Sequence, residues 1–325
     1  MKTLRWGILG AGHIAGKWAS DLALVEGAQL QAVWARDPAK SVEFGERFKA
    51  PRVAGSITEL LAVGDLDAVY VATPHGRHHD DVMACLEAGI PVLCEKAFAL
   101  NSTQAREMVQ AARSRKVLLM EALWTRFLPN FQEGLRLVTE GSIGRPVSIT
   151  TDFGFVSPYA PERRLWDPAM GGGALLDIGL YPLFFAREFL GPFESLEVEW
   201  TPAPNGVERR IQIAGIHSGG ARSHSVASFD ENLGCLSVLE AEAGKLVFER
   251  MFHTPTDLEV TDSQGVSRHL SFVREGFGYQ HETSHFCSCL LEGLLESPLW
   301  TLSRSLEQME LLDAVRAAMA FASAD

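Results

Sequence analysis

Two patterns of hydrophobic and polar positions divide the chain. In the first third, short and almost continuously apolar runs alternate with segments in which apolar residues recur at helical spacing. The apolar runs cover residues 4–9, 28–35, 66–72, 90–94 and 117–120, and helical spacing follows at segments such as 39–48 and 80–88. Strands buried on both faces and separated by helices are typical of a parallel sheet. We therefore predict a doubly wound, Rossmann-type α/β domain over residues 1–121.

Beyond residue 122 the pattern changes to alternation of apolar and polar positions. The alternating runs cover residues 147–155, 196–200, 208–214, 223–229, 234–240, 245–249 and 256–261. Such alternation predicts an open, mainly antiparallel sheet with one polar face and one face covered by helices, such as the helical segment 175–190. We expect residues 122–302 to form an α+β domain. The last helical segment, 303–322, is a candidate to return to the first domain.

Length, charge and cysteine content indicate which binding partners and which cellular location to expect. The 325 residues are long enough for two cores, and the formal net charge of -12 argues against nucleic acid or an anionic membrane as a partner. No stretch looks apolar for long enough to span a bilayer, and the N-terminus enters a strand without a signal-peptide pattern. The odd number of cysteines, five, is typical of reduced thiols. We therefore expect a cytoplasmic protein.

The turn after the first apolar run has the pattern G-x-G-x-x-A, as Gly10-Ala11-Gly12-His13-Ile14-Ala15. A strand precedes it and a helix follows, which is the context of a dinucleotide-binding fingerprint. Gly10 would permit the tight turn, Gly12 would let backbone amides approach a pyrophosphate, and Ala15 would let the helix pack closely. The anion would rest on the helix N-terminus, beside His13 and Ile14. The alternative is a plain structural turn.

The end of the second strand bears on which nicotinamide cofactor binds. An arginine there favours the 2′-phosphate of NADP, and an acidic residue favours the 2′-hydroxyl of NAD. Arg36 and Asp37 are adjacent, and Asp37 before Pro38 can equally cap the next helix. We therefore predict NADP as the cofactor, with NAD as the alternative.

Polar residues also follow the next strands, at the edge where ligands of parallel sheets bind. We expect this edge to face the cofactor through Thr73, Pro74, His78, Glu95 and Lys96. The histidines at 75, 78 and 79 are spaced along a turn that enters a helix. They give no converging ligand set, so we predict no metal site.

Three stretches stand out for chemistry: Cys94-Glu95-Lys96, residues 121–127 (EALWTRF) and residues 171–182 (GGGALLDIGLYP). With the fingerprint, they make the chain resemble the Gfo/Idh/MocA oxidoreductase family over essentially its whole length. Within that family it is similar to the branch of dimeric dihydrodiol dehydrogenases and NADP-dependent xylose dehydrogenases. This resemblance implies that Lys96 is the catalytic lysine, although Ala97 stands where a proline usually follows. It also implies that Asp177 and Tyr181 face the site.

The chemistry of these groups fits acid–base catalysis beside a nicotinamide. Positions four apart, such as Asp177 and Tyr181, share one face of a regular helix. A tyrosine titrates near 10 when unperturbed, and a nearby ammonium such as that of Lys96 lowers this value. Tyr181 could then exchange the hydroxyl proton while hydride moves between the same carbon and the nicotinamide. Taken singly, each residue also has an ordinary structural explanation.

Several further side chains are candidates for the substrate pocket, and core packing explains the aromatic ones equally well. They are Trp124, Arg126, Phe153, Phe155, Trp166, Asp177 and Phe277.

The predicted activity is hydride transfer between NADP and a secondary alcohol or hemiacetal carbon of a sugar, polyol or cyclic diol. The alternatives are an NAD-dependent glycoside hydrolase of the same fold and a non-catalytic dinucleotide sensor. The resemblance also implies that the domain of residues 122–302 binds the substrate and forms a homodimer through the open sheet face.

Overall fold

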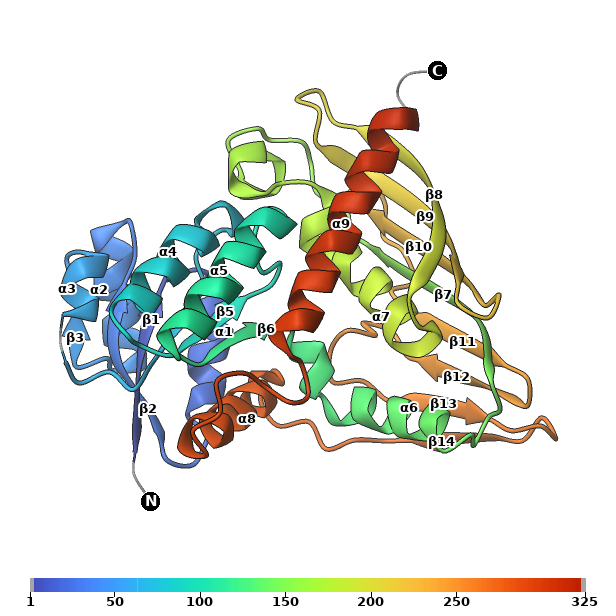
Figure 1. Ribbon diagram of the computed structural model, residues 1–325, viewed down its shortest axis with the longest axis horizontal. Helices are drawn as coiled ribbons and strands as arrows, with labels where there is room; N and C mark the ends of the chain where they lie inside the picture. The colour runs from blue at the N-terminus through green and yellow to red at the C-terminus, as the bar shows by residue number, and fades with distance from the viewer. Residues whose placement is uncertain (1–2, 63, 323–325) are drawn as a thin grey trace. The chain divides into compact units, whose positions relative to one another are not determined.

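The computed structural model describes residues 3–62 and 64–322, and the chain forms two compact units (Figure 1). Unit 1 comprises the residues up to Phe127 together with Arg274–Met309. Unit 2 comprises Leu128–Val273 and the residues from Glu310 onward. Both units therefore contain two separate segments of the chain.

Unit 1 is built on a six-stranded sheet in the order β3-β2-β1-β4-β5-β6, with every neighbouring pair parallel. The order reverses between β1 and β4, which is where doubly wound sheets open a crevice for ligands. The sheet confirms the predicted doubly wound fold. Its strands are β1 (Leu4–Leu9), β2 (Ala28–Trp34), β3 (Arg52–Val53), β4 (Ala68–Val71), β5 (Val92–Glu95) and β6 (Leu119–Ala122).

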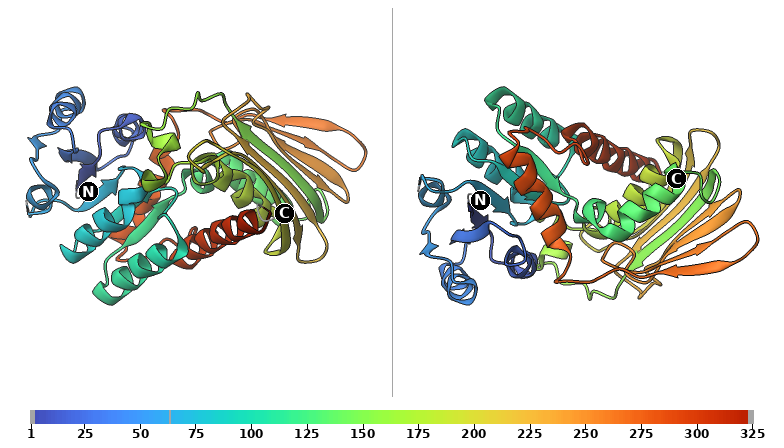
Figure 2. Two further views of the ribbon diagram at one scale, coloured as in Figure 1. Left: turned by 90° about the horizontal axis from the view of Figure 1, so that it is seen from above. Right: turned by 90° about the horizontal axis from the view of Figure 1, so that it is seen from below.

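Helices cover both faces of this sheet. On one face, Trp6 of β1 contacts Trp18 of α1 and Phe286 of α8, while α4 and α5 pack together on the opposite face (Figure 2). Helix α4 begins at His75, five residues earlier than the sequence pattern suggests. The helices are α1 (His13–Leu22), α2 (Pro38–Phe48), α3 (Ile57–Leu61), α4 (His75–Glu87), α5 (Ser102–Arg115) and α8 (Tyr279–Leu291), and a 3-10 turn, η1, spans Trp124–Phe127.

Unit 2 contains an eight-stranded sheet in the order β14-β13-β12-β11-β7-β10-β9-β8. All neighbouring pairs are antiparallel except β7 and β10, which run parallel. The predicted mainly antiparallel sheet is therefore confirmed. Its strands are β7 (Pro146–Gly154), β8 (Phe193–Pro202), β9 (Glu208–His217), β10 (Arg222–Ser228), β11 (Ser237–Ala241), β12 (Gly244–Phe248), β13 (Leu258–Thr261) and β14 (Ser267–Leu270).

Helices α6 (Pro129–Thr139) and α7 (Leu180–Leu190) lie over one face of this sheet (Figure 1). The core beneath them is aromatic: Phe131 of α6 stacks on Phe184 of α7, and Phe185 meets Phe248 of β12 edge to face. Within the described part of unit 2, no helix covers the other face of the sheet. Along β9 the residues alternate accordingly, with Ile211 and Ile213 buried and Ile216 exposed on the open face.

The segment Pro168–Leu190 is long and apolar enough to cross a membrane by composition alone, with a mean hydropathy of 1.4. The expectation that no stretch has this character is therefore wrong. In the structure 89% of its most apolar window is buried inside the protein, so core packing accounts for the apolarity. The segment contains a 3-10 turn (Pro168–Met170), a π-helical turn (Leu175–Gly179) and α7, and a further 3-10 turn, Arg164–Trp166, precedes it.

The compact units differ from the predicted domain boundaries of 121 and 302. The sequence pattern assigns residues 274–302 to the second domain, but they belong to unit 1 because α8 packs against α1. The buried carboxylate of Asp21 on α1 accepts hydrogen bonds from the backbone N–H groups of Phe277 and Tyr279. The last helix, α9 (Leu302–Ala322), has its first turns in unit 1 and the remainder in unit 2.

Candidate functional site

The fingerprint turn has the geometry that its glycines suggest. Gly10 has φ +107°, and a Cβ there would lie 2.6 Å from the carbonyl oxygen of Ala72. Only glycine therefore fits this position without moving the neighbouring strand. Gly12 is the N-cap of α1 and has no side chain to cap the helix, and no described atom lies within 4 Å of the point where its Cβ would be. The first amides of α1 are thus left for an anion.

A cavity of about 430 Å³ adjoins this helix start, between α1 and α2. Its cationic side chains are Lys17 from α1 and Lys40 and Arg47 from α2, with His13 beside them, against one acidic residue, Glu43. Among the described residues, none of Lys17, Lys40 and Arg47 has a carboxylate within ion-pair distance. In a chain with a net charge of -12, such a local excess of positive charge favours an anionic ligand.

Arg36 and Asp37 have different surroundings. The Asp37 carboxylate caps α2 by accepting a 3.0 Å hydrogen bond from the backbone N–H of Ala39. Arg36 is exposed, and no carboxylate of the described chain pairs with it. Asp37 is therefore the N-cap of α2, as the alternative reading of the sequence has it. Arg36 is the residue of the two that is left to bind a ligand.

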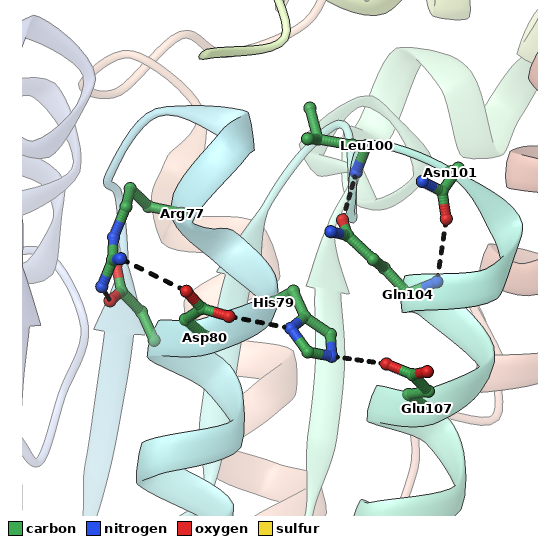
Figure 3. Close-up of polar contacts among 8 residues, drawn as sticks. Arg77, His79, Asp80, Leu100, Asn101, Gln104 and Glu107 are labelled. Atoms are coloured by element: carbon green, nitrogen blue, oxygen red, sulfur yellow. Dashed lines mark hydrogen bonds and ion pairs between the residues drawn. The ribbon is translucent and has the colours of Figure 1, made fainter. Parts of the chain in front are cut away.

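The three histidines after β4 do not converge. His78 is buried, and its ring lies 2.8 Å from the carbonyl oxygen of Thr73 and 2.9 Å from that of Ala97. It therefore fastens two loops together and offers no ring nitrogen to a cofactor. His79 instead links α4 to α5 through Asp80 and Glu107, as Figure 3 shows. Burial lowers the pKa of His78, in keeping with its interior position.

The other residues of this loop also make contacts inside unit 1. Thr73 Oγ1 donates a 2.7 Å hydrogen bond to Asp81, and Pro74 occupies the N-cap position of α4. Asp81 is held in turn by Arg77 at 2.7 Å. The loop that precedes α4 is thereby fastened to the first turns of α4, which suits a wall of a cofactor crevice.

Glu95 and Lys96 end strand β5. The Tyr70 hydroxyl donates to Glu95 Oε1, and the backbone N–H of Lys96 donates to Glu95 Oε2 at 3.1 Å. Tyr70 itself stacks on Trp18, with 4.2 Å between ring centroids. The side chain of Glu95 therefore points into the core of unit 1 and braces the backbone of Lys96. The peptide bond between Lys96 and Ala97 is cis.

Unit 2 carries the other two predicted catalytic residues on one segment. Asp177 lies in the π-helical turn Leu175–Gly179, and Tyr181 follows in the first turn of α7. The segment is not the regular helix expected from the sequence, because Asp177 stands in a π-helical turn, which has a wider repeat than an α-helix. Asp177 Oδ1 pairs with Arg164 at 2.9 Å, a partner thirteen residues earlier that no local pattern indicates.

Tyr181 is 4% exposed and lies against two other rings. Its ring centroid is 6.0 Å from that of Phe153 on β7 and 4.8 Å from that of His253 in the loop after β12. Phe153, predicted as a substrate wall, is thus brought to Tyr181. His253 is not among the residues predicted from the sequence, since an isolated histidine in a loop carries no signal of its own.

The remaining predicted pocket residues have separate environments. Phe155 packs on Phe229, and Trp166 lines a cavity of about 180 Å³ with Tyr159 and Phe229, near the Arg209–Asp230 ion pair. In unit 1, Trp124 stacks on Tyr279 at 4.6 Å, and Phe277 lines the cavity of α1 with Lys17 Nζ 5.3 Å from its ring centroid. Arg126, the last of these predicted residues, is half-buried and lies near His285. Burial lowers the pKa of His285, and the charge of Arg126 lowers it further.

One group of described side chains has the composition of a metal site: Glu249, Asp257 and His269, with ligand atoms within 4.8 Å of one another. They lie on strands and loops at the β14 end of the sheet in unit 2, and His269 hydrogen-bonds to Glu249. An ion pair between exposed groups accounts for this arrangement without a metal.

Comparison with known proteins identifies relatives of both units. The family model "Oxidoreductase family, NAD-binding Rossmann fold" matches residues 4–123, and the "GFO/IDH/MocA C-terminal domain" matches residues 131–242. The trans-1,2-dihydrobenzene-1,2-diol dehydrogenase of Mus musculus is 32% identical over 326 residues, which covers 97% of each chain.

Solved structures with the same fold include two that carry a nicotinamide cofactor. KijD10, a 3-ketoreductase from Actinomadura kijaniata in complex with NADP and TDP-benzene, has a TM-score of 0.84, 27% identity and 98% coverage of both chains. A levoglucosan dehydrogenase in complex with NADH and levoglucosan has a TM-score of 0.89, 18% identity and 98% coverage of both chains.

Proposed function

The chain belongs to the Gfo/Idh/MocA family of oxidoreductases, and from this premise we propose that it is an NADP-dependent dehydrogenase of sugars, polyols or cyclic diols. The observation that carries the proposal is the start of α1. An uncapped helix N-terminus behind a positive-φ glycine opens onto a cavity lined by cations. These features fit the pyrophosphate and phosphate groups of a dinucleotide.

NADP is proposed over NAD because of the two charges at the end of β2. Asp37 is engaged in capping α2, whereas Arg36 has no ion-pair partner in the described chain. Lys40, in the first turn of α2, is a further cation close in sequence, and it lines the cavity beside α1. A 2′-phosphate is the part of NADP that such cations recognise.

We assign the proton chemistry to three side chains of this protein. When bound, the nicotinamide supplies or accepts the hydride. Tyr181 exchanges the proton of the reacting hydroxyl, and Lys96 supplies the positive charge that favours the phenolate. Asp177, held by Arg164, orients a hydroxyl of the substrate. The buried rings around Tyr181 support this assignment, since they exclude water from its surroundings.

The activity is tested by a spectrophotometric screen. Purified protein is mixed with aldoses, polyols and dihydrodiols and with NAD or NADP, and the absorbance of the reduced nicotinamide is followed. The proposal expects turnover with at least one substrate class. Turnover with no net change in reduced cofactor, on a glycoside, would favour the hydrolase alternative. Cofactor binding without turnover of any compound would favour a dinucleotide sensor.

We also propose a homodimer formed through the open face of the sheet in unit 2. This face carries Ile216 at 44% exposure together with half-buried Val238 and Val247. Apolar side chains among polar ones on a flat sheet suit an isologous contact.

A cytoplasmic location is proposed as well. It is supported by five buried cysteines without disulfides, and fractionation of cells that produce the protein tests it.

A further inference from the structure

The glycine stretch of residues 171–173 leads into the π-helical turn and is held by contacts outside itself. Gly173 has φ +111°, a conformation that glycine adopts at little cost but that other residues rarely adopt. The backbone N–H of Gly172 donates to the carbonyl oxygen of Asp167, and that of Gly173 donates to the carbonyl oxygen of Leu165, both at 2.8 Å. These bonds tie the stretch to the preceding turns, and the tie to the sheet comes from a side chain.

That side chain is Glu208, on strand β9. Its Oε1 accepts a 2.9 Å hydrogen bond from the backbone N–H of Leu175, the first residue of the π-helical turn. The same oxygen lies where a Cβ on Gly173 would collide with it, so the chain passes directly against the carboxyl group. Glu208 is 6% exposed. The contact between the sheet and the start of the turn is therefore close and buried.

Glu208 supplies an acceptor that the local sequence lacks. Ala174 occupies the N-cap position of the turn and makes no side-chain capping bond, whereas helix starts ordinarily find such an acceptor for their first N–H groups. Burial raises the pKa of Glu208, while hydrogen bonds from the backbone N–H groups of Glu208 and Leu175 and the charge of Arg316 act in the opposite direction. The cap of this segment thus comes from a strand more than thirty residues away in the sequence.

We propose that Glu208 is a positioning residue: by fixing the first residue of the π-helical turn, it sets the orientation in which Asp177 and Tyr181 meet the substrate. The proposal rests on the proposed function, in which these two side chains take part in the proton chemistry. Asp177 follows Leu175 by two residues and Tyr181 by six, within one continuous helical segment. A shift at the start of such a segment is passed on to both side chains, and a displacement of about 1 Å can lower a rate about 10²-fold.

The first part of the test measures the backbone of the free protein. Glu208→Met keeps the length of the side chain but has no oxygen to accept the bond, and Glu208→Gln keeps an acceptor oxygen. Glu197→Met makes the same change at an exposed position of the neighbouring strand β8 and is the matched control. Amide hydrogen exchange in peptides covering residues 173–182 should be faster by roughly tenfold or more in Glu208→Met, and close to that of the parent in the other two variants.

The second part measures kcat and KM with NADP and D-xylose, D-glucose, myo-inositol or trans-cyclohexane-1,2-diol, using the probe that the parent turns over fastest. Glu208→Met should lower kcat by roughly tenfold or more, with little change in the dissociation constant of NADP. Glu208→Gln should recover most of the loss, and Glu197→Met should show none. In a Tyr181→Phe background, which already lacks the hydroxyl to be positioned, Glu208→Met should have a much smaller effect.

Thermal melting shows that each variant is folded. If Glu208→Met does not fold, Glu208→Asp, which withdraws the carboxyl group by one methylene, takes its place in both parts. A kcat within about twofold of the parent, or an equal loss in the parent and Tyr181→Phe backgrounds, would overturn the inference while the dehydrogenase activity stands. A Glu208→Gln protein as impaired as Glu208→Met would also overturn it. A parent that turns over none of the probes or of the wider substrate screen would reject the proposed function and this inference together.

Discussion

Gly10 and Tyr181 show how differently single residues constrain this protein. Gly10 is constrained by backbone alone, since its φ of +107° and the nearby Ala72 carbonyl leave no room for a Cβ. Tyr181 is constrained by its tertiary neighbours, Phe153 and His253. Substitutions at the first kind of position disturb the fold, whereas conservative substitutions at the second kind can separate chemistry from folding.

Tyr181→Phe removes only a hydroxyl from a buried ring. We expect kcat to fall by roughly 10²–10⁴-fold, the usual range for a lost general acid–base, with little change in cofactor affinity. Lys96→Met should also impair kcat and move the basic limb of the pH–rate profile upward, and Lys96→Arg should not rescue it. The measurement is kcat against pH for parent and variants. A Tyr181→Phe protein with near-parent kcat would leave Lys96 or Asp177 as the proton carrier.

Arg36→Ala tests the cofactor assignment. A charge-assisted contact to a 2′-phosphate contributes roughly 1.5–3 kcal/mol, so the variant should lose most of the preference for NADP over NAD. Dissociation constants for both cofactors are measured by calorimetry. Arg115→Ala, which removes an exposed arginine at the end of α5, is the control. Equal affinities for NADP and NAD in the parent would contradict the assignment and shift attention to Asp37.

At the scale of elements, two features stand out: the irregular turn before α7 and a buried carboxyl group on β6. A π-helical turn that contains Asp177 precedes α7, and the frequent association of π-bulges with functional sites agrees with the catalytic proposal. On β6, Glu121 is buried, and Trp300 Nε1 donates a 2.9 Å hydrogen bond to its carboxyl group. This bond ties the strand to the segment that precedes α9.

Glu121 should make the stability of the protein depend on pH. Burial raises its pKa from 4.5 to about 7, despite hydrogen bonds from Ser305 and Trp300 that act in the opposite direction. The folded state therefore holds the proton more tightly than the unfolded state does. The contribution of Glu121 to the free energy of unfolding should be greatest below pH 4.5 and should fall by roughly 3 kcal/mol as the pH rises to about 7.

Glu121→Gln should reduce the slope of the free energy of unfolding against pH, because the neutral amide has no proton to lose. Urea unfolding at pH 5, 6, 7 and 8 measures the effect, and Glu46→Gln, an exposed position on α2, is the control. Part of the slope should remain in Glu121→Gln, since burial also raises the pKa of Glu282. Identical slopes for the parent and Glu121→Gln would show that Glu121 does not titrate in this range.

At the scale of the whole molecule, both sheets can be predicted from the sequence because their periodicities differ. Continuous apolar runs predict the strands of the parallel sheet, and alternation predicts those of the mainly antiparallel sheet, although the pair β7 and β10 runs parallel. The unit boundaries cannot be predicted in this way, because the bonds that place α8 in unit 1 join Asp21 to residues more than 250 positions later. No local pattern contains such a contact.

The candidate site is predictable to the extent that its constraints are local. The fingerprint turn depends on a few adjacent residues, so the sequence alone predicts its geometry. The aromatic walls depend on packing, so Phe153 and Phe155, two positions apart at the end of β7, cannot be distinguished in advance although Phe153 is the one that contacts Tyr181. Arg164 and His253 reach their partners only through the tertiary fold.

The assembly of two chains is a prediction at this scale. Light scattering should give twice the chain mass of 35.6 kDa, and Ile216→Arg on the open sheet face should shift the protein toward the monomer. Val273→Arg changes an equally apolar residue that is 84% exposed but lies outside the strands, and it should have no effect. A parent protein that stays monomeric at all concentrations would contradict the sheet-to-sheet dimer.

The two-segment construction of unit 1 has a consequence for how the protein is made on the ribosome. Trp6 is among the first residues to emerge, yet one of its ring partners, Phe286, is translated near the end of the chain. The Asp21 carboxylate likewise gains its hydrogen bonds from the backbone N–H groups of Phe277 and Tyr279 only after those residues have been translated. The nucleotide-binding half is therefore begun first but is completed only after residues 128–273 of unit 2 have been translated. Its nascent apolar surface stays uncovered during that interval, which is when a chaperone would be needed.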